Sequence, residues 1–243
     1  MIRKLLAGFA LALFAVPATA QTVDDIIAKN IAARGGLEKI RAIKTLRTTG
    51  TMTLGPGIEV PVVIEQKRPN MMRMDVTFQG MAIAQAYDGK TGWQINPMQG
   101  RKDPEPLPEE ALKQMDLQAD VDGSPLVDYK SKGSTAELLG RDKVDGVDTY
   151  KIRLTLKTGD GLVIYIGAEQ FLEVKIESRM KTRGTEIESE STVGDYKDVG
   201  GLMIAHAMEG GQKGVPQKQK MIIQKVELNV PIDDARFKMP GSK

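Results

Sequence analysis

The sequence predicts a mainly β protein of the α+β class, built on a single curved antiparallel sheet of about eleven strands with few helices. Two observations carry this prediction. Apolar residues recur at helical spacing over residues 22–42, and from Ile43 onward they alternate with polar residues at a period of two. Gly and Asp-Gly turns separate the alternating runs, which is typical of an antiparallel meander.

Residues 22–42 contain the one long helical pattern of the chain. Thr22 is a suitable N-cap, and Asp24 and Asp25 lie in the first turn, where carboxylates interact favourably with the helix dipole. Gly35-Gly36 interrupts the apolar stripe, so the pattern also allows two short helices. In either form, we expect this region to pack on the sheet.

The strands are predicted from alternation between apolar and polar residues, bounded by turn residues. They fall into a first group before residue 97 and a second group after about residue 135. The predicted strands cover 43–54, 58–65, 72–78, 81–87 and 93–96 in the first group, and 150–156, 162–166, 172–177, 185–196, 202–208 and 218–228 in the second.

Residues 97–134 break the strand pattern. Prolines are frequent between Pro97 and Pro108, and a helix is predicted from Glu109 to about Leu117, with Pro108 near its first position. Insertions of this length in a compact domain often form lids over binding sites. Since no linker divides the chain, we expect one domain over 21–243 with a lid at 97–134.

The N-terminus resembles a secretory signal. Arg3 and Lys4 precede an apolar run that ends before Pro17, and Ala18-Thr19-Ala20 supplies the small residues that signal peptidase requires. The run of about a dozen residues is shorter than the roughly 20 that a membrane-spanning helix needs. We therefore predict a signal peptide over 1–20, cleaved after Ala20; the alternative is an N-terminal membrane anchor.

Composition excludes several classes of function. Without Arg3 and Lys4, the chain has 32 basic and 32 acidic residues, so its net charge is near zero and nucleic acid is not an expected partner. The absence of cysteine excludes disulfides, thiolate metal sites and a lipid anchor attached at cysteine. We expect a soluble periplasmic protein.

Motifs for catalysis are weak. His206 is the only histidine, so it would have to serve any Ser/His/Asp triad, and we expect a structural role for it. Gly89-Lys90-Thr91 lacks the first glycine of a phosphate loop, because residue 84 is alanine. Aspartates near Asp122 and Asp145 lack the spacing of a calcium loop. We expect no enzyme activity, no cofactor and no metal.

Methionine is the distinctive apolar residue, since twelve of the thirteen lie after residue 20. Methionine is flexible and polarisable, so it suits surfaces that bind varied apolar ligands, although it also fills ordinary cores. A curved sheet with few helices has a concave face that a ligand can occupy. Methionines on the predicted strands are Met52, Met72, Met74, Met81 and Met203.

Several short motifs together resemble the periplasmic lipoprotein-localisation carriers, the LolA/LolB-like family, and the broader group of outer membrane lipoprotein-sorting proteins. The resemblance covers nearly all of residues 21–243, and the order of elements also agrees. The motifs are Lys67-Arg68-Pro69-Asn70, Asp88-Gly89-Lys90-Thr91, Trp93, Asn96-Pro97, Gly194-Asp195-Tyr196, Gly200-Gly201, Asn229-Val230-Pro231, Phe237 and Pro240.

This resemblance implies an open half-barrel whose concave side is closed by helices around a hydrophobic cavity for acyl chains. It assigns to Arg68 the role of holding the lid closed, through hydrogen bonds from its guanidinium to lid carbonyls. We expect acyl chains to pack on the apolar strand faces, at Leu46, Met52, Leu54, Val62, Ile64, Met72, Met74, Val76, Phe78, Ile152, Leu154 and Ile164.

The function expected from this resemblance is a carrier of lipoproteins or related lipids towards the outer membrane. Its partners would be acyl chains and membrane-bound donor and acceptor proteins, with the carrier itself a monomer. The alternative is a sensor module of the same fold that binds a protein partner. A hydrolase would need His206 or an acidic residue as its catalytic group.

Overall fold

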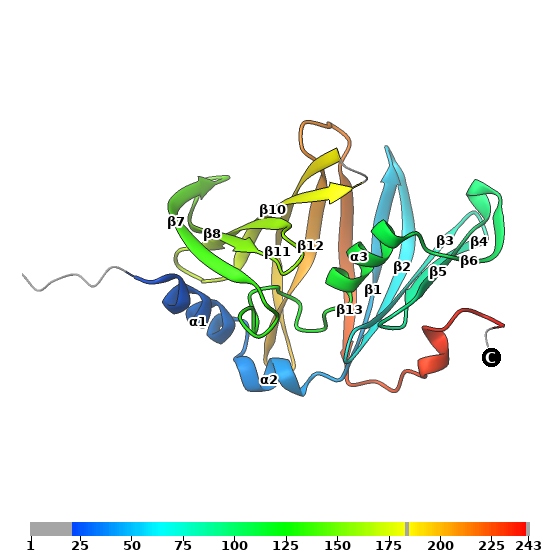
Figure 1. Ribbon diagram of the computed structural model, residues 1–243, viewed down its shortest axis with the longest axis horizontal. Coiled ribbons are helices and arrows are strands. Elements are labelled where there is room, and N and C mark those ends of the chain that lie inside the picture. The colour runs from blue at the N-terminus through cyan, green and yellow to red at the C-terminus, as the bar shows by residue number, and fades with distance from the viewer. Residues whose placement is uncertain (1–20, 183–184, 242–243) are drawn as a thin grey trace, which may run out of the picture.

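The computed structural model describes residues 21–182 and 185–241, so the predicted signal peptide lies outside the described residues. Figure 1 shows one broad, strongly curved sheet with short helices beside it. The helices are α1 (Val23–Ala33), α2 (Leu37–Ala42) and α3 (Glu109–Gln118), with 3₁₀ turns η1 (Pro97–Gln99) and η2 (Asp234–Arg236).

The described residues form thirteen strands in one open sheet. The strands are β1 (Thr45–Gly55), β2 (Ile58–Lys67), β3 (Met71–Phe78), β4 (Met81–Tyr87), β5 (Gly92–Asn96), β6 (Arg101–Pro106), β7 (Thr135–Val144), β8 (Val147–Thr155), β9 (Gly161–Gly167), β10 (Glu173–Thr182), β11 (Thr185–Val199), β12 (Leu202–Gln212) and β13 (Gln219–Leu228). The predicted class, mainly β with a single antiparallel sheet, is confirmed.

The sheet consists of two meanders joined edge to edge. Its order is β6-β5-β4-β3-β2-β1-β13-β12-β11-β10-β9-β8-β7, and β1 pairs antiparallel with β13 from Leu46↔Leu228 to Met52↔Met221. This pairing places the last strand of the chain beside the first, in the middle of the sheet. Strands from both ends of the sequence therefore share one concave face.

The sequence analysis did not predict β6, which lies in the segment assigned to the insertion. Pro104 and Pro106 discourage a strand assignment, because proline cannot donate a ladder hydrogen bond. Since β6 is an edge strand that pairs only with β5, the structure tolerates both prolines. This strand is one reason why the observed number exceeds the prediction.

The N-terminal helical region forms two helices, not one. Thr22 makes a capping box with Asp25: its Oγ1 accepts from the Asp25 amide at 3.2 Å, and its amide donates to the Asp25 carboxylate at 3.0 Å. Gly35 and Gly36 have φ values of 115° and 93°, which end α1 and re-aim the chain into α2. α1 lies at the β7–β8 end of the sheet (Figure 1).

The chain between β6 and β7 must cross the molecule, because these strands are the two opposite edges of the sheet. Residues 107–134, here called the crossing segment, contain α3 and a long loop. Leu107 and Met115 pack with Met72, Val121 and Val127 pack with Ile40, and the segment's far end packs with α1. The crossing segment therefore runs along the concave face from one meander to the other.

The C-terminal residues cover the opposite face of β1–β5. Phe237 is fully buried, and its carbonyl accepts a 3.0 Å hydrogen bond from the Trp93 indole. Arg236 pairs with the buried Glu65, which alternates with the cavity-facing Ile64 and therefore lies on the convex side. These contacts brace strands that carry part of the concave wall.

Candidate functional site

The concave face contains a cavity of about 1240 Å³ that opens to solvent. Its wall combines strands of both meanders with parts of α2 and the crossing segment. Five of the residues expected to bind acyl chains line this cavity, and all five belong to β1, β2 or β3. They are Leu46, Met52, Ile64, Met72 and Met74.

Other expected residues on the first meander do not line the cavity, although some of them pack directly against side chains that do. Val62 and Val76 are buried in a cluster with Val60, and Phe78 packs against that cluster. The side chain of Leu54 lies outside the described part of the chain.

Ile152, Leu154 and Ile164 are fully buried beneath α1, where they pack with Ile26 and Ile27. α1 therefore fills the β7–β9 end of the concave face, and the cavity occupies the remainder.

The second meander supplies cavity residues of which only Met203 was singled out from the sequence, as a strand methionine suited to apolar ligands. They come from β10 to β13, which the β1–β13 pairing brings opposite β2 and β3. The apolar alternation of 172–177, 202–208 and 218–228 predicts that these segments are strands. It does not show that they lie away from α1, which leaves their concave face open to the cavity. The apolar residues are Ile176, Val193, Met203, Ile204, Met208, Met221 and Ile223.

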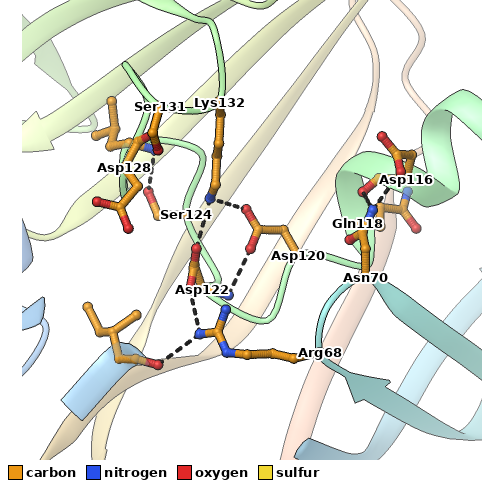
Figure 2. Close-up of polar contacts among 12 residues, drawn as sticks. Arg68, Asn70, Asp116, Gln118, Asp120, Asp122, Ser124, Asp128, Ser131 and Lys132 are labelled. Atoms are coloured by element: carbon orange, nitrogen blue, oxygen red, sulfur yellow. Dashed lines mark hydrogen bonds and ion pairs between the residues drawn. The ribbon is translucent and has the colours of Figure 1, made fainter. Parts of the chain in front are cut away.

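Arg68 connects the turn after β2 to the crossing segment, as Figure 2 shows. Its guanidinium donates to the carbonyls of Ile43 (2.6 Å) and Ile40 (3.0 Å) and to Asp122 Oδ1 (2.6 Å). The carbonyls belong to the end of α2, and the contact with the crossing segment is the Asp122 carboxylate. Arg68 therefore contacts the predicted lid segment, but through the carboxylate of Asp122 and not through backbone carbonyls of the lid.

Asp122 is the centre of a charged cluster formed by Arg68, Asp120, Asp122 and Lys132, here called the Arg68 cluster (Figure 2). Lys132 Nζ lies 2.8 Å from Asp122 Oδ2 and 2.5 Å from Asp120 Oδ2. Burial alone would raise the pKa of Asp122, but the hydrogen bonds from Lys132 and Arg68 outweigh it and hold the pKa below its usual value. The carboxylate is therefore charged at neutral pH.

A second set of contacts fixes α3 over the first meander. Asn70 donates to Asp116 Oδ1 at 2.5 Å, and Gln66 donates to the Gln118 carbonyl at 2.7 Å. The Tyr87 hydroxyl donates to the same Asp116 oxygen at 2.9 Å. Burial and the Asp116 charge raise the pKa of Tyr87 to about 12, so it remains a donor. Lys67-Arg68-Pro69-Asn70 thus supplies polar contacts to both parts of the crossing segment.

The Arg68 cluster predicts a pH dependence of stability. Because the folded-state pKa of Asp122 is lowered from 3.8, its carboxylate stabilises the fold above that pH and loses the effect as pH falls through the lowered value. The stability advantage of wild type over Asp122→Asn should therefore shrink on acidification from about pH 5 to about pH 2. Urea unfolding across this range measures it; a difference that stays constant would contradict the assignment.

The single histidine and the carboxylates were the candidates for catalytic or metal-binding groups. His206 is buried on β12, and its Nδ1 lies 2.8 Å from the Ile204 carbonyl. Within 21–182 and 185–241, no three histidine, aspartate or glutamate residues lie close enough to hold a metal ion. No helix in the same part of the chain is long and apolar enough to span a membrane.

Comparison of the structure with solved proteins gives clear matches in fold. A LolA superfamily protein from Nitrosomonas europaea superposes with a TM-score of 0.61 at 14% identity, covering 90% of this chain and 98% of the other. An outer membrane lipoprotein-sorting protein domain from Vibrio parahaemolyticus gives 0.58 at 12% identity, covering 88% and 94%.

A DUF1329 family protein from Desulfovibrio piger also gives a TM-score of 0.58, at 11% identity, covering 90% of this chain and 98% of the other. No family model matches the sequence, and no curated protein matches it. At this level of identity the likeness concerns the fold. The chain therefore has the fold of the LolA superfamily and of lipoprotein-sorting domains.

Proposed function

We propose that the protein is a periplasmic carrier that binds the acyl chains of lipoproteins or related lipids in its cavity and transfers them towards the outer membrane. The observation that carries this proposal is the cavity itself: a space of about 1240 Å³, open to solvent, with a mostly apolar lining surface to which methionine and aliphatic side chains of both meanders contribute. An open apolar space of this size is what an acyl chain requires. The shared fold with lipoprotein-sorting domains supports the same role.

Burial of acyl chains supplies the binding energy. Each methylene group removed from water contributes about 0.8 kcal/mol, so the binding energy grows with the length of chain that the cavity covers. A carrier must also release its cargo to an acceptor protein. The Arg68 cluster suits this need, because its polar contacts add to the apolar packing that holds the crossing segment and can break without unfolding the sheet. In this proposal, the crossing segment is the lid and Arg68 is its gate.

Native mass spectrometry of protein purified from the periplasm of its own cells tests the proposal. We expect a monomer that begins at Gln21 and carries bound lipid or lipoprotein. A stable partner protein without acyl groups would support the sensor alternative. Repeated isolation without any acyl compound, and failure to bind added acyl compounds, would overturn the carrier proposal.

A further inference from the structure

Three polar side chains meet at one part of the cavity wall, here called the polar end. Arg34, Glu173 and Tyr196 all line the cavity, although they come from the end of α1, the start of β10 and the middle of β11. The Tyr196 hydroxyl donates to the Glu173 carbonyl at 2.9 Å and lies 3.4 Å from Glu173 Oε2. Three polar side chains from separate elements thus meet at one place on the cavity wall.

A backbone irregularity turns Glu173 inward. Glu173 pairs with Ile166, but Lys175 pairs with Tyr165, so Val174 is an extra residue in β10. Such a bulge changes which face the neighbouring side chains occupy. Without it, Glu173 would share the outer face with Lys175; with it, Glu173 joins Ile176 on the cavity wall.

A different irregularity precedes Tyr196, where the pairing of β11 with β12 keeps its register. Asp195 has a φ of 50°, in the left-handed region that non-glycine residues seldom adopt. Ser191 and Val193 line the cavity, as alternate residues of a strand do. Continued alternation would place Asp195 on the cavity wall next, but Tyr196 lies there instead. The Gly194-Asp195-Tyr196 motif, which the sequence analysis noted, thereby delivers a phenol beside Glu173.

The polar end retains one unused acceptor and one unused donor. Glu173 is only 5% exposed, and its Oε1 is buried without a hydrogen-bond partner. Arg34 Nη1 is also buried without a partner, while its Nη2 donates to the Asp122 carbonyl at 2.8 Å. A buried polar atom without a partner costs about 1–3 kcal/mol, and more when it is charged.

The chemistry of these two atoms defines a complementary ligand. Glu173 Oε1 needs an O–H or N–H donor, and Arg34 Nη1 needs a carbonyl or similar acceptor. A free fatty acid would offer a carboxylate to Arg34 but would place a second anion beside Glu173. A simple alkyl ester would satisfy Arg34 and leave Glu173 unpaired. A neutral head group that contains both a carbonyl and an O–H or N–H donor can form a hydrogen bond with Arg34 Nη1 and with Glu173 Oε1.

We propose that Glu173 and Arg34 form a head-group site for acyl compounds in which an ester or amide carbonyl lies beside an O–H or N–H donor. The proposal rests on the proposed function, since the acyl chain would occupy the apolar part of the same cavity. The head group has two sources, a free acylglycerol or the acylated N-terminus of a lipoprotein. Both present the same chemistry to the site.

Calorimetric titration of the whole exported chain with three decanoyl compounds tests this site. Monodecanoylglycerol has both groups, methyl decanoate lacks the donor, and decanoate has a charged head. We expect wild type to bind the monoacylglycerol about 10-fold more tightly than the methyl ester, as one hydrogen bond to a charged group predicts. Glu173→Met removes the acceptor and should bring this ratio close to one.

Two further variants keep the test decisive. Ile176→Leu lies on the same strand and cavity wall, keeps its volume and should preserve the ratio. Glu173→Gln keeps the shape of the side chain and should lower the ratio even if Glu173→Met does not fold. A synthetic acylated cysteinyl peptide identifies the source: the same dependence on Glu173 points to lipoproteins, and its absence points to free acylglycerols.

The outcomes separate this inference from the proposed function. Equal binding of all three decanoyl compounds by wild type, or an unchanged ratio in the Glu173 variants, would overturn the head-group site and leave the carrier proposal intact. No binding of any acyl compound by wild type would overturn both.

Discussion

Replacement of Met74 by glutamate is expected to lower the affinity for acyl ligands by about 100-fold, equivalent to about 2.7 kcal/mol. Met74 lines the cavity and pairs across the sheet with Ile64, another cavity residue. An acyl chain on this wall would remove the new carboxylate from water without giving it a partner. Since Met74 is only half-buried in the unliganded chain, the substitution should leave the fold intact.

Titration with monodecanoylglycerol measures this effect, with circular dichroism as the check on folding. Met74→Leu is the matched control, because it conserves volume and polarity and should bind as wild type does. Met98→Glu adds the same charge at an exposed position outside the cavity wall and should also have no effect. Wild-type affinity in Met74→Glu would contradict the placement of the ligand.

Replacement of Arg68 by leucine is expected to accelerate ligand release by about 10-fold or more. The substitution removes the guanidinium that joins Asp122 to the carbonyls of Ile40 and Ile43. Hydrogen bonds to charged groups contribute about 1.5–3 kcal/mol each, so the crossing segment should be held over the cavity less tightly, by an amount that can be measured. The sheet does not depend on these contacts, and the variant should fold.

Stopped-flow release of a fluorescent acyl probe measures this rate. Arg41→Leu is the matched control, because Arg41 also joins α2 to the crossing segment, through Asp128, but its side chain is 58% exposed. Exposed ion pairs contribute about 0–1 kcal/mol, so release from this variant should change little. Equal release rates in Arg68→Leu and wild type would show that Arg68 is not a gate.

Local features of the fold followed from the sequence because short-range chemistry determines them. Thr22 and Asp25 form the predicted cap, and α3 begins directly after Pro108, close to its predicted position. Gly35-Gly36 separates two helices because both residues have positive φ. In each case the cause lies within a few residues of the effect, so a single sequence is sufficient.

Features that depend on distant residues did not follow in the same way. Alternation placed Ile152 and Ile64 equally well on an apolar strand face, but it could not show that α1 covers Ile152 and leaves Ile64 on the cavity wall. The crossing segment exists because β6 and β7 are opposite edges, which only the complete strand order reveals. Glu173 faces the cavity because of a bulge in β10, and no glycine or other turn residue marks the position of this bulge in the sequence.

NMR signals of the methionine methyl groups locate a bound acyl chain directly. Methionine methyl groups labelled with carbon-13 give a separate NMR signal for each position, and a fatty acyl ligand with a spin label near its chain end broadens the signals close to it. We expect selective broadening of Met52, Met72 and Met74, which line the cavity, while the exposed Met98 and the convex-face Met239 stay sharp. Broadening confined to Met98 or Met239, or none at saturating ligand, would contradict an acyl-binding cavity.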